Sequence, residues 1–177
     1  MTMKFRIAPD AGIDLVADIH RRAFGQNEEA ELTRAMLGDP TARPYYSILA
    51  YHGDEPAGHV LFTSVAVEPA NALTASILCP LAVVPEQQSM GTGGGLIHDG
   101  LERLRNDGCD LVFVLGDPGY YGRFGFASCP AGLDAPFPLP PMYQAGWMCQ
   151  ALTDAGTGAR GTVRCADTLN DPKYWAE

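Results

Sequence analysis

Residues 83–96 read Val-Val-Pro-Glu-Gln-Gln-Ser-Met-Gly-Thr-Gly-Gly-Gly-Leu, a glycine-rich segment that follows an apolar run. The apolar run at 77–84 predicts a buried strand before the glycines, and the helical spacing of apolar residues over 93–106 predicts a helix after them. A glycine-rich loop between a strand and a helix N-terminus exposes several backbone N–H groups, and the helix dipole favours negative charge there. The stretch therefore predicts a loop that holds phosphate.

The segments around this loop predict a mixed α/β fold. Helical periodicity predicts helices at 13–24 and 28–37 as well as at 93–106. Short apolar runs predict strands at 4–7, 46–52, 58–67, 75–84, 111–115, 147–152 and 161–166, with turns at 53–56 and 154–158 and a proline-rich loop at 130–141. Short turns favour antiparallel neighbours, whereas the helix between the strands at 75–84 and 111–115 suits a parallel crossover. We therefore expect a central mixed, mostly antiparallel sheet flanked by helices.

Composition narrows the classes of protein. The chain has 177 residues, a size that suits one domain, and its net charge of −9 argues against a nucleic-acid surface. Its five cysteines contain no C-x-x-C pair and its four histidines show no metal-ligand spacing, so we expect no metal site. No apolar run long enough to span a bilayer is present, so no membrane partner is expected and the cytoplasm is the expected location.

The glycine loop alone does not identify its ligand. It lacks the Lys-Ser/Thr of a Walker A motif, and Leu96 stands where a Rossmann fingerprint has its third glycine. A structural turn is an equally good interpretation of an isolated loop of this kind. A nucleotide-binding domain of another class also stays open at this point.

A second segment narrows the choice. Residues 115–126 read Leu-Gly-Asp-Pro-Gly-Tyr-Tyr-Gly-Arg-Phe-Gly-Phe and follow the next predicted strand directly. Together with 81–93, this segment resembles the GNAT superfamily of N-acetyltransferases. That family has a strand, V-x-P, Q/R-x-x-G-x-G/A and a helix, then a second strand and a Tyr four residues before Gly-Phe. Tyr121 stands four residues before Gly125. The motif GDPxYYxRFGF at 116–126 resembles that of a bacterial branch of predicted N-acetyltransferases.

The resemblance implies acetyl-CoA as cosubstrate and no metal, bound where two parallel strands of the sheet splay apart. Backbone N–H groups of the loop would hold its pyrophosphate, and free edges of the preceding strand would bind its pantetheine amides. The implied CoA-binding residues are Leu81, Ala82, Val83, Gln88, Ser89, Met90, Gly91, Thr92, Gly93, Gly94 and Asp117. For Asp117, a cofactor contact and a helix cap are both open interpretations.

Tyr121 is the implied general acid, which would protonate the departing thiolate; an aromatic core residue is the alternative. The expected domain is the whole chain, with the motifs in a core at 1–126. Strands and loops at 127–177 would close the acceptor side.

The function that follows is acetyl transfer to a primary amine by direct attack in a ternary complex. A non-catalytic acyl-CoA-binding module on the same fold is the rival. The acceptor would be a small-molecule or peptide amine, and a homodimer stays open. The strand at 77–84 carries no acid or histidine, so Glu28, Glu29 and Glu31 are candidate bases, although a solvated helix face explains them equally.

Overall fold

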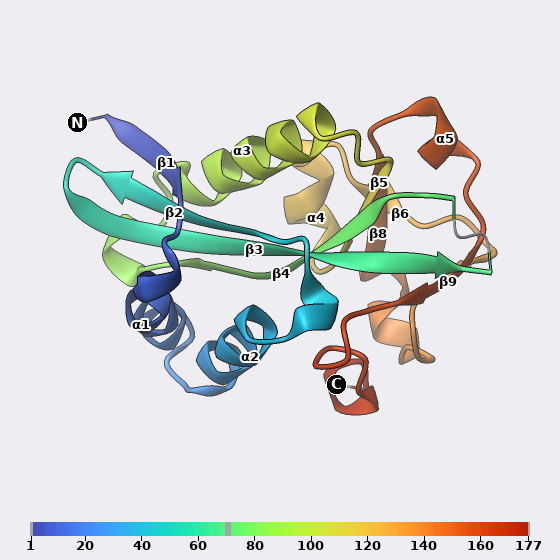
Figure 1. The fold of residues 1–177 in the computed structure, drawn as a ribbon, viewed down its shortest axis with the longest axis horizontal. Coiled ribbons are helices and arrows are strands. Elements are labelled where there is room, and N and C mark those ends of the chain that lie inside the picture. Colours follow the sequence, from blue (N-terminus) through green and yellow to red (C-terminus); the bar gives the residue numbers. More distant parts are fainter. Residues whose placement is uncertain (1, 70–71, 177) are drawn as a thin grey trace.

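A twisted sheet with helices on both faces forms the protein, as the computed structural model shows for residues 2–69 and 72–176 (Figure 1). Helices α1 (Ile13–Phe24) and α2 (Glu28–Leu37) cover one face. The longer α3 (Thr92–Asn106) and the single turn α4 (Pro118–Tyr121) lie on the other face, and the short α5 (Asp154–Thr157) follows near the end of the chain. The helices therefore cover both faces of the sheet.

The sheet is mixed and mostly antiparallel, as expected. Its main path runs β1-β2-β3-β4-β5-β8-β6, and β9 pairs with the end of β3 and with β7. The strands are β1 (Met3–Ile7), β2 (Tyr46–His52), β3 (Glu55–Glu68), β4 (Ala75–Val83), β5 (Leu111–Leu115), β6 (Ala127–Ser128), β7 (Leu133–Asp134), β8 (Trp147–Ala151) and β9 (Gly161–Arg164). The parallel neighbours are β4 with β5 and β7 with β9. The crossover from β4 through α3 to β5 has the predicted order.

The parallel pair splays apart after a few residues. Strands β4 and β5 are paired from Ala75 opposite Leu111 to Ile77 opposite Phe113. Beyond Ile77, β4 continues to Val83 in register with β3 alone. One edge of β4 is thus left open just before the glycine loop, which confirms the expected splayed pair.

The core has two layers because successive residues of a strand point to opposite faces. In β2, Ile48 belongs to the layer under α3, whereas Leu49 belongs to the layer under α1 and α2. Both side chains are buried. A sheet covered on both faces needs continuous apolar strands, which is why these strands lack the polar–apolar alternation of a half-exposed sheet.

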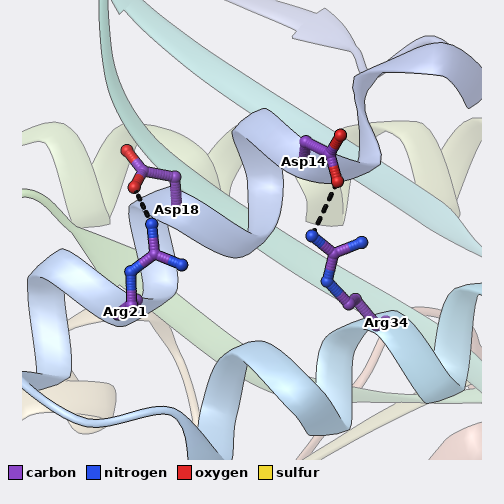
Figure 2. Close-up of polar contacts among 4 residues, drawn as sticks. All are labelled: Asp14, Asp18, Arg21 and Arg34. Carbon is purple, nitrogen blue, oxygen red and sulfur yellow. Dashed lines mark hydrogen bonds and ion pairs between the residues drawn. The ribbon is translucent and has the colours of Figure 1, made fainter.

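Helices α1 and α2 lie side by side and are also linked at their surfaces. Arg34 of α2 donates from Nη2 to Asp14 Oδ1 of α1 over 2.7 Å, and Arg21 pairs with Asp18 within α1 (Figure 2). These side chains are exposed, so each ion pair contributes at most about 1 kcal/mol. The buried Ile19 and Met36 carry more of the packing that fixes α2 over the sheet.

The structure differs from the sequence expectations at a few ends. The turn after β2 is shorter than predicted, because Glu55 and Pro56 already belong to β3. The loop at 130–141 contains the two-residue strand β7, and the turn at 154–158 contains α5. Across 2–69 and 72–176, no helix combines the length and apolarity needed to cross a membrane.

Candidate active site

A cavity of about 650 Å³ lies between the glycine loop, the open edge of β4 and the segment after β5. Its walls are formed by Leu81, Val83, Gln87, Gln88, Ser89, Gly91, Thr92, Gly93, Gly94, Gly95, His98, Tyr120, Arg123 and Phe124. The cavity therefore unites most of the residues singled out in the sequence. Ala82, Met90, Asp117 and Tyr121 are the predicted site residues outside this lining.

The glycine loop presents unpaired N–H groups to the cavity. Gly91, with φ of +81°, is the N-cap of α3, and the first capped bond runs from Gly95 N–H to Gly91 O over 2.9 Å. The N–H groups of the first helical turn before Gly95 have no partner inside the helix. Because glycine at the N-cap has no side chain to accept them, these donors lack a side-chain acceptor at the wall of the cavity. The Met90 side chain is half exposed and lies outside the lining of the cavity.

The open edge of β4 supplies a second set of backbone groups. Val84 N–H donates to Ala57 O of β3, and Val83 lies opposite Gly58. Hydrogen bonds alternate along an antiparallel ladder, so the backbone groups of Leu81 and Val83 point away from β3 toward the gap. Ala82 belongs to the ladder with β3 and buries its side chain in the layer under α1 and α2.

Gln88 connects the strand to the loop. Its side-chain Nε2 donates to Val83 O over 3.0 Å, so one of the outward carbonyls of β4 is already occupied. This contact fixes the loop relative to the strand edge.

The turn α4 places two tyrosines at different points of the site. Asp117 caps it, because the Oδ1 accepts from Gly119 N–H over 2.9 Å, and Pro118 follows at the first helical position, where proline is favoured. The cap role of Asp117 is thus observed. The hydroxyl of Tyr120 reaches the first turn of α3 beside Gly93. Tyr121 instead turns its ring against Gly116, at the end of β5.

Tyr121 is a half-buried phenol held by aromatic neighbours. Its ring meets Tyr120 and Phe126 edge-on, with centroids 5.0 Å and 6.0 Å away. Burial raises the pKa of Tyr121 above its ordinary value of about 10, and the neighbouring Tyr120 and Cys79 raise it further. The hydroxyl therefore keeps its proton at neutral pH. The effect of Cys79 on this pKa, together with the packing of the ring against Gly116, indicates that Tyr121 lies near the gap between β4 and β5.

The side chains of Arg123 and His98 lie in the cavity wall and were not predicted from the sequence. The Arg123 guanidinium carbon lies 4.9 Å from the Tyr120 ring centre and 5.4 Å from that of Phe124, and brings a positive charge to the wall. His98 of α3 meets Phe124 edge-on at 5.5 Å. Arg123 could have been predicted as a wall residue, because it stands inside the tyrosine-containing motif. His98 could not, because it is a single exposed residue on a helix.

A second, apolar cavity of about 180 Å³ lies at the other mouth of the gap. It is formed by Leu32, Ile77, Leu78, Cys79, Leu115, Leu169, Tyr174 and Trp175. Burial, followed by the charge of Glu29, raises the pKa of Cys79 to about 12. Glu29 of α2 is half buried, whereas Glu28 and Glu31 are exposed. Of the three glutamates predicted as candidate bases, Glu29 thus acts electrostatically on the gap.

In the described part of the chain, no three His, Cys, Asp or Glu side chains are grouped closely enough to hold a metal ion.

Comparison with known proteins gives the family. The model of the acetyltransferase (GNAT) domain matches residues 4–129, which includes both motifs, α3 and the turn α4. The chain therefore belongs to the GNAT family of acetyltransferases, and the resemblance seen in the sequence is confirmed.

Two Escherichia coli proteins are similar along nearly the whole chain. The uncharacterized N-acetyltransferase YjhQ of strain K12 is 42% identical over 166 residues, which is 92% of each protein. The uncharacterized N-acetyltransferase YhbS of the same strain is 29% identical over 172 residues, covering 96% of this chain and 99% of YhbS.

Solved structures show the same fold. The crystal structure of E. coli YhbS in complex with CoA has a TM-score of 0.84 and 26% identity, and covers 96% of this chain and 92% of YhbS. A GNAT family acetyltransferase from Brucella melitensis in complex with acetyl-CoA has a TM-score of 0.75 and 25% identity, with 95% and 98% covered.

Proposed function

We propose that this protein is an acetyl-CoA-dependent N-acetyltransferase that moves the acetyl group to a primary amine by direct attack in a ternary complex. The observation that carries the proposal is the cavity in which the glycine loop meets the open edge of β4, with the phenol of Tyr121 outside its lining, at the end of β5. The CoA and acetyl-CoA complexes of YhbS and the Brucella protein support the choice of cosubstrate.

The residues present suit a CoA-type ligand. N–H groups of Thr92, Gly93 and Gly94 would bind the pyrophosphate, where α3 directs its positive dipole end. Arg123 would add a cation, and the Tyr120 hydroxyl would add a donor beside Gly93. The pantetheine amides would pair with the open edge of β4, at the backbone groups of Leu81 and the N–H of Val83, as an added strand does, because Gln88 already donates to Val83 O.

Tyr121 would act as general acid. The departing CoA sulfur gains negative charge as its bond to the acetyl carbon breaks, and the Tyr121 phenol, which is protonated at neutral pH, would donate its proton to it. Because the Tyr121 ring packs against Gly116 at the end of β5, we infer that its hydroxyl lies near the point to which the strand edge would direct the thiol end.

Direct attack is supported by the state of Cys79. This cysteine lies at the gap, and a covalent acetyl-cysteine route would need its thiolate as the nucleophile. Its pKa of about 12 keeps it a neutral thiol, which is inert toward a thioester. The amine itself would therefore attack the acetyl group.

The acceptor would enter through the apolar cavity on the face of α1 and α2. Leu169, Tyr174 and Trp175 of the C-terminal segment form part of its wall, consistent with the proposed closing role of 127–177. The carboxylate of Glu29, which acts electrostatically on Cys79, would attract the amine and receive its proton, directly or through water. We therefore propose that the acceptor is a primary amine with a mainly apolar body, bound in this cavity, whose wall includes Cys79, the residue on which the charge of Glu29 acts.

The test is release of CoA from acetyl-CoA with a panel of primary amines. We expect turnover with amines on aromatic or aliphatic bodies, and a large loss of kcat in the Tyr121→Phe variant. Tight acetyl-CoA binding without turnover on any amine would instead favour the acyl-CoA-binding module. Protection from thermal unfolding by acetyl-CoA, compared with ATP and NAD, checks the ligand class independently of turnover.

A further inference from the structure

Cys129 and Cys149 lie beside one another across the strand pair β6–β8. Ala127 is opposite Cys149 and Ser128 is opposite Met148, and Cys129 N–H continues the ladder by donating to Trp147 O over 2.8 Å. Residues two apart on one strand share a face, so Cys129 and Cys149 are diagonal neighbours on the same face of the sheet. Both side chains are half buried and pack against the edge of the core layer under α1 and α2.

The two thiols act on each other. Their side chains are in hydrogen-bond contact, which lowers the pKa of Cys149 and raises that of Cys129. The charge of Arg160 lowers the pKa of Cys149 further, against the effect of its burial. The pair thus contains one nucleophilic sulfur and one thiol that donates to it.

The other three cysteines have the opposite character. Burial is the largest cause raising the pKa of Cys79, Cys109 and Cys165. They therefore serve as internal references for ordinary buried thiols.

A small oxidant can reach the pair from solvent. Cys129 lines an open cavity of about 470 Å³ that also involves Pro130, Gln144 and Trp147. This cavity is separate from the residues assigned to CoA and acceptor, so the pair has no role in the proposed acetyl transfer.

We propose that Cys129 and Cys149 form a dithiol site that a hydroperoxide oxidises reversibly to a disulfide between β6 and β8. The Cys149 thiolate attacks the terminal peroxide oxygen, so that an S–O bond forms, the O–O bond breaks and the departing alkoxide takes the proton of Cys129. The Cys129 thiolate then attacks the Cys149 sulfur; the S–S bond forms and hydroxide leaves as water with the proton that Cys149 had released. Two thiols lose two electrons, and one peroxide is reduced to an alcohol and water.

The experiment uses the reduced full-length protein, treated with a small molar excess of hydrogen peroxide and then alkylated. Trypsin releases both cysteines in one peptide, 124–160, because no Lys or Arg lies between Arg123 and Arg160. We expect this peptide unalkylated and two hydrogens lighter than its reduced form, with Cys79, Cys109 and Cys165 still alkylated. Dithiothreitol should restore two alkylated cysteines.

Variants separate the roles of the two sulfurs. In Cys129→Ser, Cys149 should stop at a sulfenic acid that dimedone traps, whereas in Cys149→Ser, Cys129 should stay alkylatable. Cys109→Ser is the matched control and should leave the disulfide yield unchanged. The proposal is overturned if peptide 124–160 of the oxidised protein carries two alkyl groups, if its cysteines become sulfinic or sulfonic acids, or if the disulfide joins two chains.

Discussion

The hydroxyl of Tyr120 occupies the space that a Cβ on residue 93 would fill. Gly93 lies in the first turn of α3, and Tyr120 comes from α4, beyond the next strand. The absence of a side chain at residue 93 therefore lets a phenol approach the first turn of α3.

Replacing Gly93 with Ala should displace that hydroxyl and weaken binding of acetyl-CoA. We expect KM for acetyl-CoA to rise at least about tenfold, which corresponds to about 1.4 kcal/mol, with a smaller effect on kcat. The ring carbon Cζ of Tyr120 lies 3.6 Å from the same Cβ position, an ordinary contact. In the Tyr120→Phe background, Gly93→Ala should thus have little further effect.

Steady-state kinetics of the single and double variants check this coupling. Gly122→Ala is the matched control, because nothing lies within 4 Å of its Cβ position. Additive effects of Gly93→Ala and Tyr120→Phe would contradict the proposed contact.

Replacement of Tyr121 and of Tyr120 should affect different kinetic constants. Tyr121→Phe removes the proposed proton donor and should lower kcat by about 10²- to 10⁴-fold with KM for acetyl-CoA nearly unchanged. Tyr120→Phe should mainly raise KM, because its hydroxyl lies at the glycine loop. Parallel kcat and KM measurements on both variants decide the assignment, and a reversed pattern would make Tyr120 the acid.

Cys79 should not carry the acetyl group. Because its pKa is about 12, incubation with acetyl-CoA in the absence of acceptor should leave the intact mass of the protein unchanged. The Cys79→Ala variant should keep kcat within about tenfold, whereas loss of a covalent nucleophile costs several orders of magnitude. An adduct of one acetyl group on the peptide that contains residue 79 would refute direct attack.

A buried histidine pair should make the fold sensitive to mild acid. His20 Nε2 lies 2.8 Å from His59 Nδ1, and His59 Nε2 lies 2.7 Å from Ser47 Oγ. Burial lowers the pKa of His20 to about 4, and burial with the charge of His20 lowers that of His59 well below 6.5. The unfolded chain binds protons on both rings below about pH 6.5, whereas in the folded chain His20 stays neutral to about pH 4 and His59 also stays neutral well below pH 6.5.

The free energy of unfolding should accordingly be level between about pH 7 and 8 and fall between pH 6.5 and 4. The slope is up to about 1.4 kcal/mol per pH unit for each histidine. Urea unfolding at a series of pH values measures this slope. His20→Gln should reduce it, and His98→Gln, at an exposed position, should not. A flat profile from pH 7 to 5 would rule out neutral burial of the pair.

Much of the fold was predictable because its signals are local. The bounds of α2, β2 and β5 agree with the predicted ranges, since apolar periodicity and the turn residues beside each element specify them. The glycine loop between a strand and a helix was equally predictable, because its strand, glycines and helix are contiguous. The predicted β4 edge was refined: Leu81 and Val83 face the gap, and Ala82 faces the core.

Other features depend on contacts between distant segments. The sequence alone determined the order of the main elements and the glycine loop, because these signals arise from residues within a few positions of one another, and its two motifs carried the resemblance to the family. Tertiary structure alone decided that Tyr120 meets Gly93, that Cys129 meets Cys149, and that Trp175 closes a cavity with Leu32. These pairs are set by strand register and by the packing of layers. The residues next to each of them in the sequence do not indicate which distant residue it contacts.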